Sequence, residues 1–318
     1  MNTVLRSEVY ANLAQRLGSD LLRQRLEKQA NHWARLNHQG EGLFKIERLL
    51  PLDSLMKTFL KLGGLTKLGR KGFLGLRVVE KDWVIAGFPK ALDGFRLLQL
   101  TDLHLDLDQE LLPIICELIK ITPHDGAVIT GDFRNTTREN SMGCMVGMKK
   151  IISALTGPRA GVLGNHDFIE IVPELEAAGL PILLNETMAI GEVGARFWLC
   201  GVDDPHFYKT HDFAKARGMM PLGEATILLC HTPEAAEEAA GYGYNLMLAG
   251  HTHGGQMCLP GGRVLVCPVR RSMPQERVKG AWRCGGMQGY TSVGTGSCGV
   301  AARFYCPPEI TVHRLRSC

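Results

Sequence analysis

Aspartate, asparagine and histidine side chains gather in five short blocks of this chain, and each block accompanies an apolar, strand-like run. Carboxylate oxygens, amide oxygens and imidazole nitrogens are donors that hold borderline divalent ions such as Mn, Fe, Zn or Co. The blocks therefore indicate metal-dependent chemistry. In chain order they are Asp102-Leu103-His104, Gly131-Asp132, Gly164-Asn165-His166-Asp167, His231 and Gly250-His251-Thr252-His253.

The position of each block within its run indicates how the side chains would meet. In LLQLTDLHL, Asp102 and His104 stand two residues apart, so on an extended chain both point to the same face. The last block repeats this spacing with His251 and His253. The other blocks follow the ends of strand-like runs, where open α/β folds place their sites. A lone histidine after an apolar run is more often structural, but five ordered blocks at strands predict one shared metal site.

The five blocks resemble the ordered motifs of the calcineurin-like metallophosphoesterase superfamily, which read DxH, GDxxD, GNH(D/E), H and GHxH. The resemblance covers about residues 95–315, and the tail GTG…RFYCPPEITVHRL is similar to the closing strands of a bacterial membrane-associated branch. It implies two divalent metal ions, manganese first, with iron, zinc or cobalt as alternatives. One ion would be held by Asp102, His104, Asp132 and His253, and the other by Asp132, Asn165, His231 and His251, with Asp132 bridging.

The same resemblance implies catalytic roles for His166 and Asp167. Two cations can bind the oxygens of a phosphoryl group and lower the pKa of a bridging water, whose hydroxide attacks phosphorus in line. His166 would be a non-ligand that protonates or stabilises the leaving oxygen, with Asp167 fixing its orientation. The alternative is that His166 only caps a turn. Where GDxxD has its second acid, this chain has Asn135, so a supporting contact is expected to differ while the metal ligands remain.

Three residues outside the ligand set are candidates for contact with the substrate. Arg134 follows Asp132 by two residues, and a guanidinium suits the oxygens of a phosphate. Asn135 stands next to it. The segment GVDDPHF follows a strand and could present His206 or Asp204 to the substrate, with solvated loop residues as the alternative.

The composition is typical of a large α/β protein and not of a nucleic-acid-binding one. Of the 318 residues, 45% are hydrophobic, enough for a sizeable core. The net charge of +4 is uneven, because residues 1–94 hold sixteen Lys and Arg against nine Asp and Glu, whereas the remainder is acidic. That acidity and the 7% of aromatic residues disfavour an extended groove for nucleic acid. Ten cysteines without a CxxC pair are interpreted as buried reduced thiols.

Hydrophobic periodicity predicts the elements that must position the blocks. Leucines at near-helical spacing predict helix over residues 4–36. From residue 77 short apolar strands, among them residues 95–103 and 181–186, alternate with helical patterns, and the last third is rich in strands. We therefore expect an α/β fold with two mixed β-sheets packed as a sandwich and flanked by helices. Two domains are predicted, a helical, basic extension over residues 1–76 and a catalytic domain over residues 77–318.

Residues 54–76 differ in kind from the rest of the chain. They contain five Lys or Arg, no acid and ten Leu, Met or Phe, which predicts two amphipathic helices separated by Gly63 and Gly64. Apolar faces flanked only by cations suit an anionic membrane surface. Core packing and disorder are the alternatives.

The expected location follows from what the chain lacks. The N-terminus has no apolar signal segment, and no stretch reaches the roughly 18 apolar residues of a spanning helix. We therefore expect a cytoplasmic protein, peripheral on the inner membrane face. No protein partner and no specific nucleic-acid partner is predicted.

The resemblance implies hydrolysis of a phosphodiester or pyrophosphate bond. Within the superfamily, one branch cleaves UDP-2,3-diacylglucosamine in lipid A synthesis, and a lipid-linked nucleotide of this kind is a candidate substrate here, although the GNHD block differs from the form of that branch in which Arg replaces the His. A general phosphodiesterase or a nuclease is the first alternative, because the same site cuts both kinds of ester. A non-catalytic, metal-binding scaffold is the second, although a scaffold would not need every ligand block.

Overall fold

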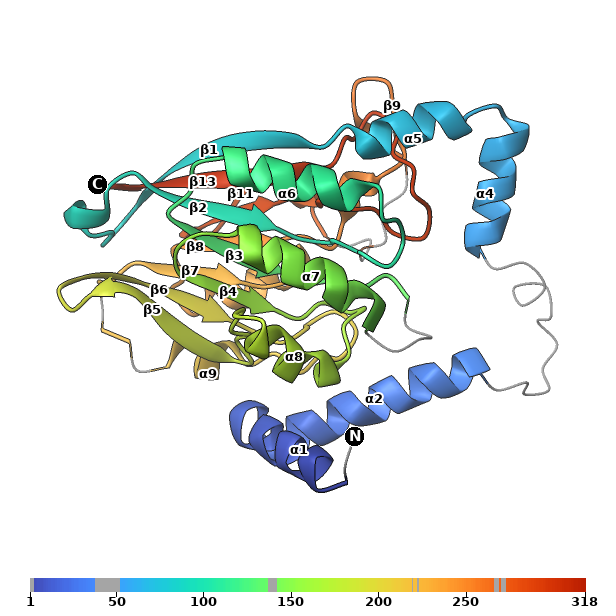
Figure 1. Ribbon diagram of the computed structural model, residues 1–318. Helices are drawn as coiled ribbons and strands as arrows, with labels where there is room; N and C mark the ends of the chain where they lie inside the picture. Colours follow the sequence, from blue (N-terminus) through green and yellow to red (C-terminus); the bar gives the residue numbers. More distant parts are fainter. Residues whose placement is uncertain are drawn as a thin grey trace.

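A computed structural model describes residues 3–37, 52–136, 142–218, 220–221, 223–265, 269 and 273–318 of the chain. Two mixed β-sheets stack face to face with helices outside them (Figure 1), which confirms the expected fold class. The first sheet has the order β1 (Arg77–Ile85), β13 (Glu309–Ser317), β2 (Phe95–Leu100), β3 (Gly126–Thr130) and β4 (Arg159–Val162). The second has the order β11 (Gly280–Cys284), β12 (Met287–Thr291), β8 (Leu246–Ala249), β7 (Thr226–Leu229), β6 (Ala195–Gly201) and β5 (Glu186–Glu192).

Parallel pairing dominates the middle of both sheets. Strands β2, β3 and β4 run parallel, as do β6, β7, β8 and β12. Antiparallel pairs join β13 to β2, β5 to β6 and β11 to β12. Central parallel strands are covered on both faces, so their sequences are continuous apolar runs. Every residue of β3, β7 and β8 is buried, as that pattern requires.

An apolar cluster fills the space between the two sheets. Leu97 and Val128 contribute from the first sheet, and Phe197, Ile227 and Leu248 from the second, each at most 1% exposed. Each of these side chains stabilises the fold by about 1.5–3 kcal/mol relative to an exposed position. The sandwich therefore depends on inward-facing residues of both sheets.

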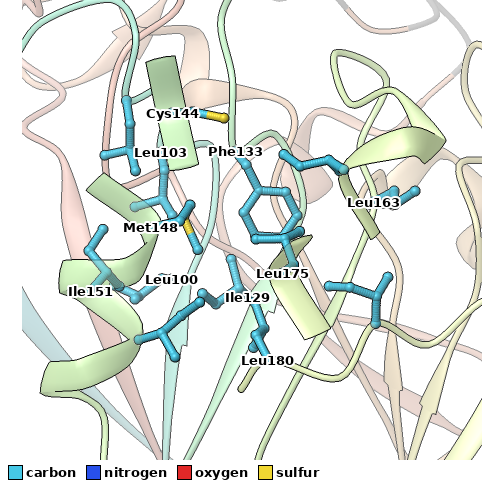
Figure 2. Packing of buried hydrophobic residues seen from close by; sticks show 14 of the residues in the cluster. Leu100, Leu103, Ile129, Phe133, Cys144, Met148, Ile151, Leu163, Leu175 and Leu180 are labelled. Atoms are coloured by element: carbon cyan, nitrogen blue, oxygen red, sulfur yellow. The ribbon is translucent and has the colours of Figure 1, made fainter. Parts of the chain in front are cut away.

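A second cluster lies on the outer face of the first sheet (Figure 2). Leu100 and Ile129 from the strands pack there against Met148, Ile151 and Leu175 from the helices that cover this face. This layer anchors the strands whose ends carry the predicted site. The helices that cover this face are α6 (Leu111–Ile121), α7 (Met142–Ala154) and α8 (Val172–Ala177). Two short helices, α9 (Phe213–Arg217) and α10 (Ala236–Ala240), pack on the outer face of the second sheet.

The helical structure predicted over residues 4–36 is confirmed, and it consists of two helices, α1 (Thr3–Leu17) and α2 (Ser19–Asn37). The break falls at Gly18, whose φ of +105° suits glycine and not the other residue types. Leu13 and Leu17 are 1% exposed and belong to the apolar cluster of the first sheet. Arg16 also pairs with Glu176 of α8 at 2.9 Å. These helices thus pack on the core, although the predicted domain boundary at residue 77 stays a prediction.

The basic segment forms the two helices predicted for it, α4 (Leu52–Leu62) and α5 (Thr66–Leu74), separated at Gly63 and Gly64. α5 leads towards β1 and α4 lies at the periphery (Figure 1), where Leu60 packs against Val300 and Ala302. Leu60 and Phe73 are buried, so part of the segment packs on the protein. No helix in the described part of the chain combines the length and apolarity needed to cross a membrane.

Two strand predictions were wrong in position. The run predicted as a strand over residues 95–103 ends as β2 at Leu100, because the backbone then turns into left-handed conformations at Asp102 and His104. The run 181–186 makes only an isolated bridge at Ile182, and the strand there is β5, which begins at Glu186. β5 is an edge strand with several exposed residues, so it lacks a clear apolar signal.

Candidate metal centre

The five blocks meet at one edge of the sandwich because each follows the carboxyl end of a parallel strand. Asp102, Asp132 and Asn165 come shortly after β2, β3 and β4 of the first sheet. His231 and His251 come two residues after β7 and β8 of the second sheet. Stacking the two sheets therefore brings donors from distant parts of the chain together.

The first predicted donor set is compact. His104 Nε2 lies 3.3 Å from His253 Nε2 and 3.5 Å from Asp132 Oδ2. His253 Nε2 lies 3.4 Å from Asp102 Oδ1. The donor atoms of Asp102, His104 and Asp132 all fall within 4.8 Å of one another, a spacing that a metal ion can fill. The structure thus brings together the four residues predicted for one ion.

The second predicted donor set adjoins the first. Asn165 Oδ1 lies 3.1 Å from His231 Nε2 and 2.9 Å from His251 Nδ1. His231 Nε2 lies 3.4 Å from Asp132 Oδ2, the same oxygen that faces His104. Asp132 Oδ2 therefore stands between the two sets, where a bridging ligand belongs.

The chemistry of these groups fits divalent cations. Burial raises the pKa of Asp102 to about 6, with His231 opposing the rise and Asp132 adding to it. Burial lowers the pKa of His104 to about 4, so its imidazole is neutral at pH 7 and offers a lone pair. Burial opposes ionisation of Asp132, but His231 and His166 hold its pKa well below the usual range. Buried carboxylates beside the neutral imidazole of His104 are an arrangement that a bound cation stabilises.

The backbone at these ligands is not extended, so the same-face argument for Asp102 and His104 was wrong. Both have left-handed φ angles, of 51° and 44°, and Asp132, His251 and His253 share this conformation. A left-handed conformation costs a residue other than glycine about 1–2 kcal/mol, so it persists only where contacts with its surroundings hold it in place. Here the backbone N–H groups of Asp102 and His104 donate to the carbonyls of Gly131 and Asp132, which fixes one loop against the other.

Glycines precede several ligands because the loops approach each other closely. A Cβ at Gly164 would collide with the Asp132 carboxylate, and a Cβ at Gly250 would collide with the carboxylate of Asp102. Any larger residue at these two positions would displace a predicted ligand.

His166 lies beside the two sets without belonging to either. Its Nδ1 is 2.7 Å from the carbonyl oxygen of Asn135, and its backbone N–H donates to Asp132 Oδ1. Burial lowers the pKa of His166, but the Asp132 carboxylate and Cys298 raise it to about 10. The ring is therefore oriented through Nδ1, and its Nε2 faces the thiol of Cys298, with Sγ at 4.0 Å.

The prediction that Asp167 orients His166 was wrong. The Asp167 carboxylate accepts hydrogen bonds from the backbone N–H groups of Asp132, Phe133 and Gly164, at 2.8–3.0 Å. It therefore fixes two ligand loops against each other, and the carbonyl of Asn135 orients the histidine instead.

The three predicted substrate contacts have different surroundings. The Arg134 guanidinium stacks on Phe168 at 4.3 Å and its Nε donates to the carbonyl of Thr136, so the structure does not support a phosphate contact. The side chain of Asn135 is likewise engaged, because its Oδ1 accepts from the Gly299 N–H. His206 does reach the centre.

The ring of His206 lies 4.3 Å from that of His251, and its Nδ1 is 2.6 Å from Glu234 Oε2. Its neighbour Asp204 accepts three backbone hydrogen bonds within its own loop. His206 is therefore the candidate of this group that stands next to a predicted ligand.

Cys298 adjoins the centre and was not predicted. Its Sγ lies 4.0 Å from His166 Nε2 and within 4.8 Å of donor atoms of His104 and His253. No spacing in the sequence marked it, because it follows a strand of the second sheet through an irregular loop. The nine described cysteines are free thiols, whereas Cys267 lies outside the described residues.

Arg25 of α2 also contacts the loops of the centre, and sequence periodicity gave no sign of it. Its guanidinium is fully buried, with Nη1 2.7 Å from Asp203 Oδ1 and Nη2 2.8 Å from the carbonyl of Asp167. It also stacks on Tyr208 at 3.8 Å. The N-terminal helices thus support the loop that carries Asn165 and His166.

We expect Arg25→Met to lower the free energy of unfolding by about 3–5 kcal/mol, because Asp203 would remain buried and unpaired. Urea unfolding measures this change. The matched control is Arg23→Met, since Arg23 pairs with Asp20 on the surface, with side chains 71% and 88% exposed. Such exposed pairs contribute about 1 kcal/mol or less. A loss below 1 kcal/mol in Arg25→Met would contradict the support assigned to this residue.

Comparison with known proteins finds relatives named metallophosphoesterase or phosphodiesterase. No family model matches the chain. It is 28% identical over 239 residues to the uncharacterized metallophosphoesterase YkuE of Bacillus subtilis, covering 72% of this chain and 82% of that protein. It is 29% identical over 290 residues to an uncharacterized metallophosphoesterase of Helicobacter pylori, covering 85% and 74%. It is 29% identical over 165 residues to the phosphodiesterase YaeI of Escherichia coli, covering 50% and 58%.

The relatives and the geometry agree. Several proteins named metallophosphoesterase align with more than two thirds of this chain. The chain also has a fold of two sheets with the donors gathered at one edge. The individual ligand assignments stay predictions. The similarity to these relatives, together with the gathered donors, supports membership of the calcineurin-like metallophosphoesterase superfamily.

Proposed function

We propose that this protein hydrolyses a phosphodiester or pyrophosphate bond at a centre of two divalent metal ions. The observation that carries the proposal is the position of Asp132 Oδ2, 3.5 Å from His104 Nε2 and 3.4 Å from His231 Nε2. One carboxylate oxygen thus faces both donor sets. The name of the Escherichia coli relative, a phosphodiesterase, supports a diester as the substrate.

The chain's own groups divide the remaining work. When bound, the ions polarise the phosphoryl oxygens and supply a nucleophile at neutral pH. His166, held through Nδ1 by the carbonyl of Asn135, would give its Nε2 proton to the leaving oxygen. Asp167 and Arg25 hold the loop in place, and His206 stands where it can contact the substrate beside His251.

Manganese is the ion we propose first. The two sets combine carboxylate and amide oxygens with imidazole nitrogens, and no thiolate is among the predicted ligands. Such mixed oxygen and nitrogen donors suit Mn, with Fe, Zn or Co as alternatives.

The test is to restore activity after chelation. We expect the chelated protein to leave bis(p-nitrophenyl) phosphate intact and to hydrolyse it once Mn²⁺ is added, with Fe²⁺, Zn²⁺ and Co²⁺ compared in parallel. A monoester and plasmid DNA in the same assay would separate a diesterase from a phosphatase and a nuclease. If none of the esters were hydrolysed with any of the ions, the function would instead be that of a non-catalytic, metal-binding scaffold.

The finer substrate that we propose is a lipid-linked nucleotide such as UDP-2,3-diacylglucosamine, cleaved at the inner membrane face. The cationic and apolar helices α4 and α5 support it, since a lipid substrate must be met at a bilayer. The measurement compares UDP-2,3-diacylglucosamine with a UDP-sugar that has no acyl chains, both radiolabelled. We expect cleavage of the acylated compound only. If it stays intact while a simple phosphodiester is cleaved, the lipid-linked substrate is excluded.

A further inference from the structure

The hairpin formed by α4 and α5 combines exposed apolar side chains with exposed lysines. Phe59 is 67% exposed and Leu62 is 84% exposed, although both belong to the predicted apolar faces. Lys57, Lys61 and Lys67 are exposed as well. Among the side chains that the structure describes, which on α4 begin at Met56, no carboxylate forms an ion pair with any of these three lysines. A surface of this kind is complementary to an apolar layer bordered by negative charge.

A cavity of about 580 Å³ lies between the hairpin and residues 300–302. Its cationic wall consists of Lys57, Lys61, Lys67 and Arg70, and Leu60 with residues 300–302 supply apolar lining. Arg70 is already paired, because its Nη1 lies 2.6 Å from Asp108 Oδ2. The three lysines are therefore the groups that remain for an anionic ligand.

The hairpin is attached to the segment that supports the metal centre. The backbone N–H of Arg303 donates to the carbonyl of Gly69 in α5 at 3.0 Å. The Arg303 guanidinium in turn donates to the carbonyl of His253 and lies 3.3 Å from its Nδ1. Whatever binds the hairpin is therefore held at a fixed distance from the donors.

We propose that the α4–α5 hairpin docks the protein on an anionic phospholipid bilayer, with a lipid phosphate in the lysine-lined cavity and Phe59 and Leu62 among the acyl chains. Each lysine near an anionic surface strengthens binding about fivefold, so the three together account for about 100-fold. The proposal goes beyond hydrolysis, because this surface would bind lipid whether or not the centre is active.

The experiment is vesicle flotation of the full chain, performed in the presence of chelator so that binding does not depend on turnover. Vesicles of phosphatidylcholine with 30 mol% phosphatidylglycerol are compared with pure phosphatidylcholine. We expect binding to the anionic vesicles only. The triple variant Lys57→Gln/Lys61→Gln/Lys67→Gln should bind about 100-fold more weakly, with an unfolding midpoint that shows it is folded.

The matched control removes the same charge elsewhere. Lys120, Lys149 and Lys150 are exposed on α6 and α7, so their triple change to Gln should leave flotation, and turnover of a soluble diester, within about twofold of the parent. Equal losses in both triple variants would show a general charge effect and overturn the proposal. So would an absence of binding to anionic vesicles.

A further variant separates a lipid from a free phosphate in the cavity. Phe59→Ser/Leu62→Ser keeps every lysine but removes the apolar contact, and we expect at least tenfold weaker flotation from the buried area lost. Undiminished flotation of this variant, together with displacement by millimolar inorganic phosphate, would show a site for a free anion and overturn membrane docking. Hydrolysis is measured separately, so failure of docking and failure of the phosphoesterase remain distinguishable.

Discussion

Asp132→Asn protein is expected to lose both metal ions and to turn over at least about 1,000-fold more slowly, since the ions supply several kcal/mol of transition-state stabilisation. One oxygen, Asp132 Oδ2, faces both His104 and His231, so a neutral amide weakens both donor sets at once. Asparagine keeps the acceptor at Oδ1 for the His166 N–H, and the loop is therefore preserved. Elemental analysis of the purified variant and turnover with added Mn²⁺ measure the two effects.

The control for this variant is a remote aspartate. Asp82 in β1 has a side chain that is 61% exposed and lies outside the five blocks. Asp82→Asn should therefore retain the metal content and turnover of the parent. Two ions per chain in Asp132→Asn would contradict the bridging position.

His166→Ala protein is expected to retain its metal while turnover falls by about 100- to 10,000-fold, the usual contribution of a positioned acid. The residue contacts the centre but belongs to neither donor set, so its loss removes proton donation and leaves the ligands in place. Elemental analysis measures the metal content of the variant, and steady-state kinetics measure its turnover.

A comparison of esters with different leaving groups distinguishes proton donation by His166 from a merely structural role. An alkoxide needs protonation on departure far more than p-nitrophenolate does, so His166→Ala should damage hydrolysis of an alkyl diester more than that of an aryl diester. Equal losses on both esters, or turnover near that of the parent, would exclude proton donation by this residue.

Much of the candidate site could be predicted because its signals are local. A buried parallel strand is an uninterrupted apolar run, and a polar residue two positions beyond it, such as Asp132 after β3, stands at the edge where such strands end together. Asp102 and His104 differ from this pattern. Their convergence was correct, but it arises from left-handed backbone held by neighbouring loops and not from an extended strand.

Contacts that join distant segments could not be predicted in this way. The hydrogen bond from His166 to Asn135 uses a backbone carbonyl, which carries no residue type that a pattern can detect. Cys298 comes close to His166 only through a loop without regular spacing. The edge strand β5 was missed because its half-exposed sequence resembles a loop as much as a strand.

The ion pair between Arg25 and Asp203 bears on how shorter versions of this protein should be designed. A fragment that starts at residue 77 would begin where the composition of the chain changes. It would, however, lack Leu13 and Leu17 of the apolar cluster, and Asp203 would lose its counter-charge. We expect such a fragment to be produced mainly as insoluble aggregate. Shortened versions of the protein should therefore retain α1 and α2, whichever residues between α2 and β1 are removed.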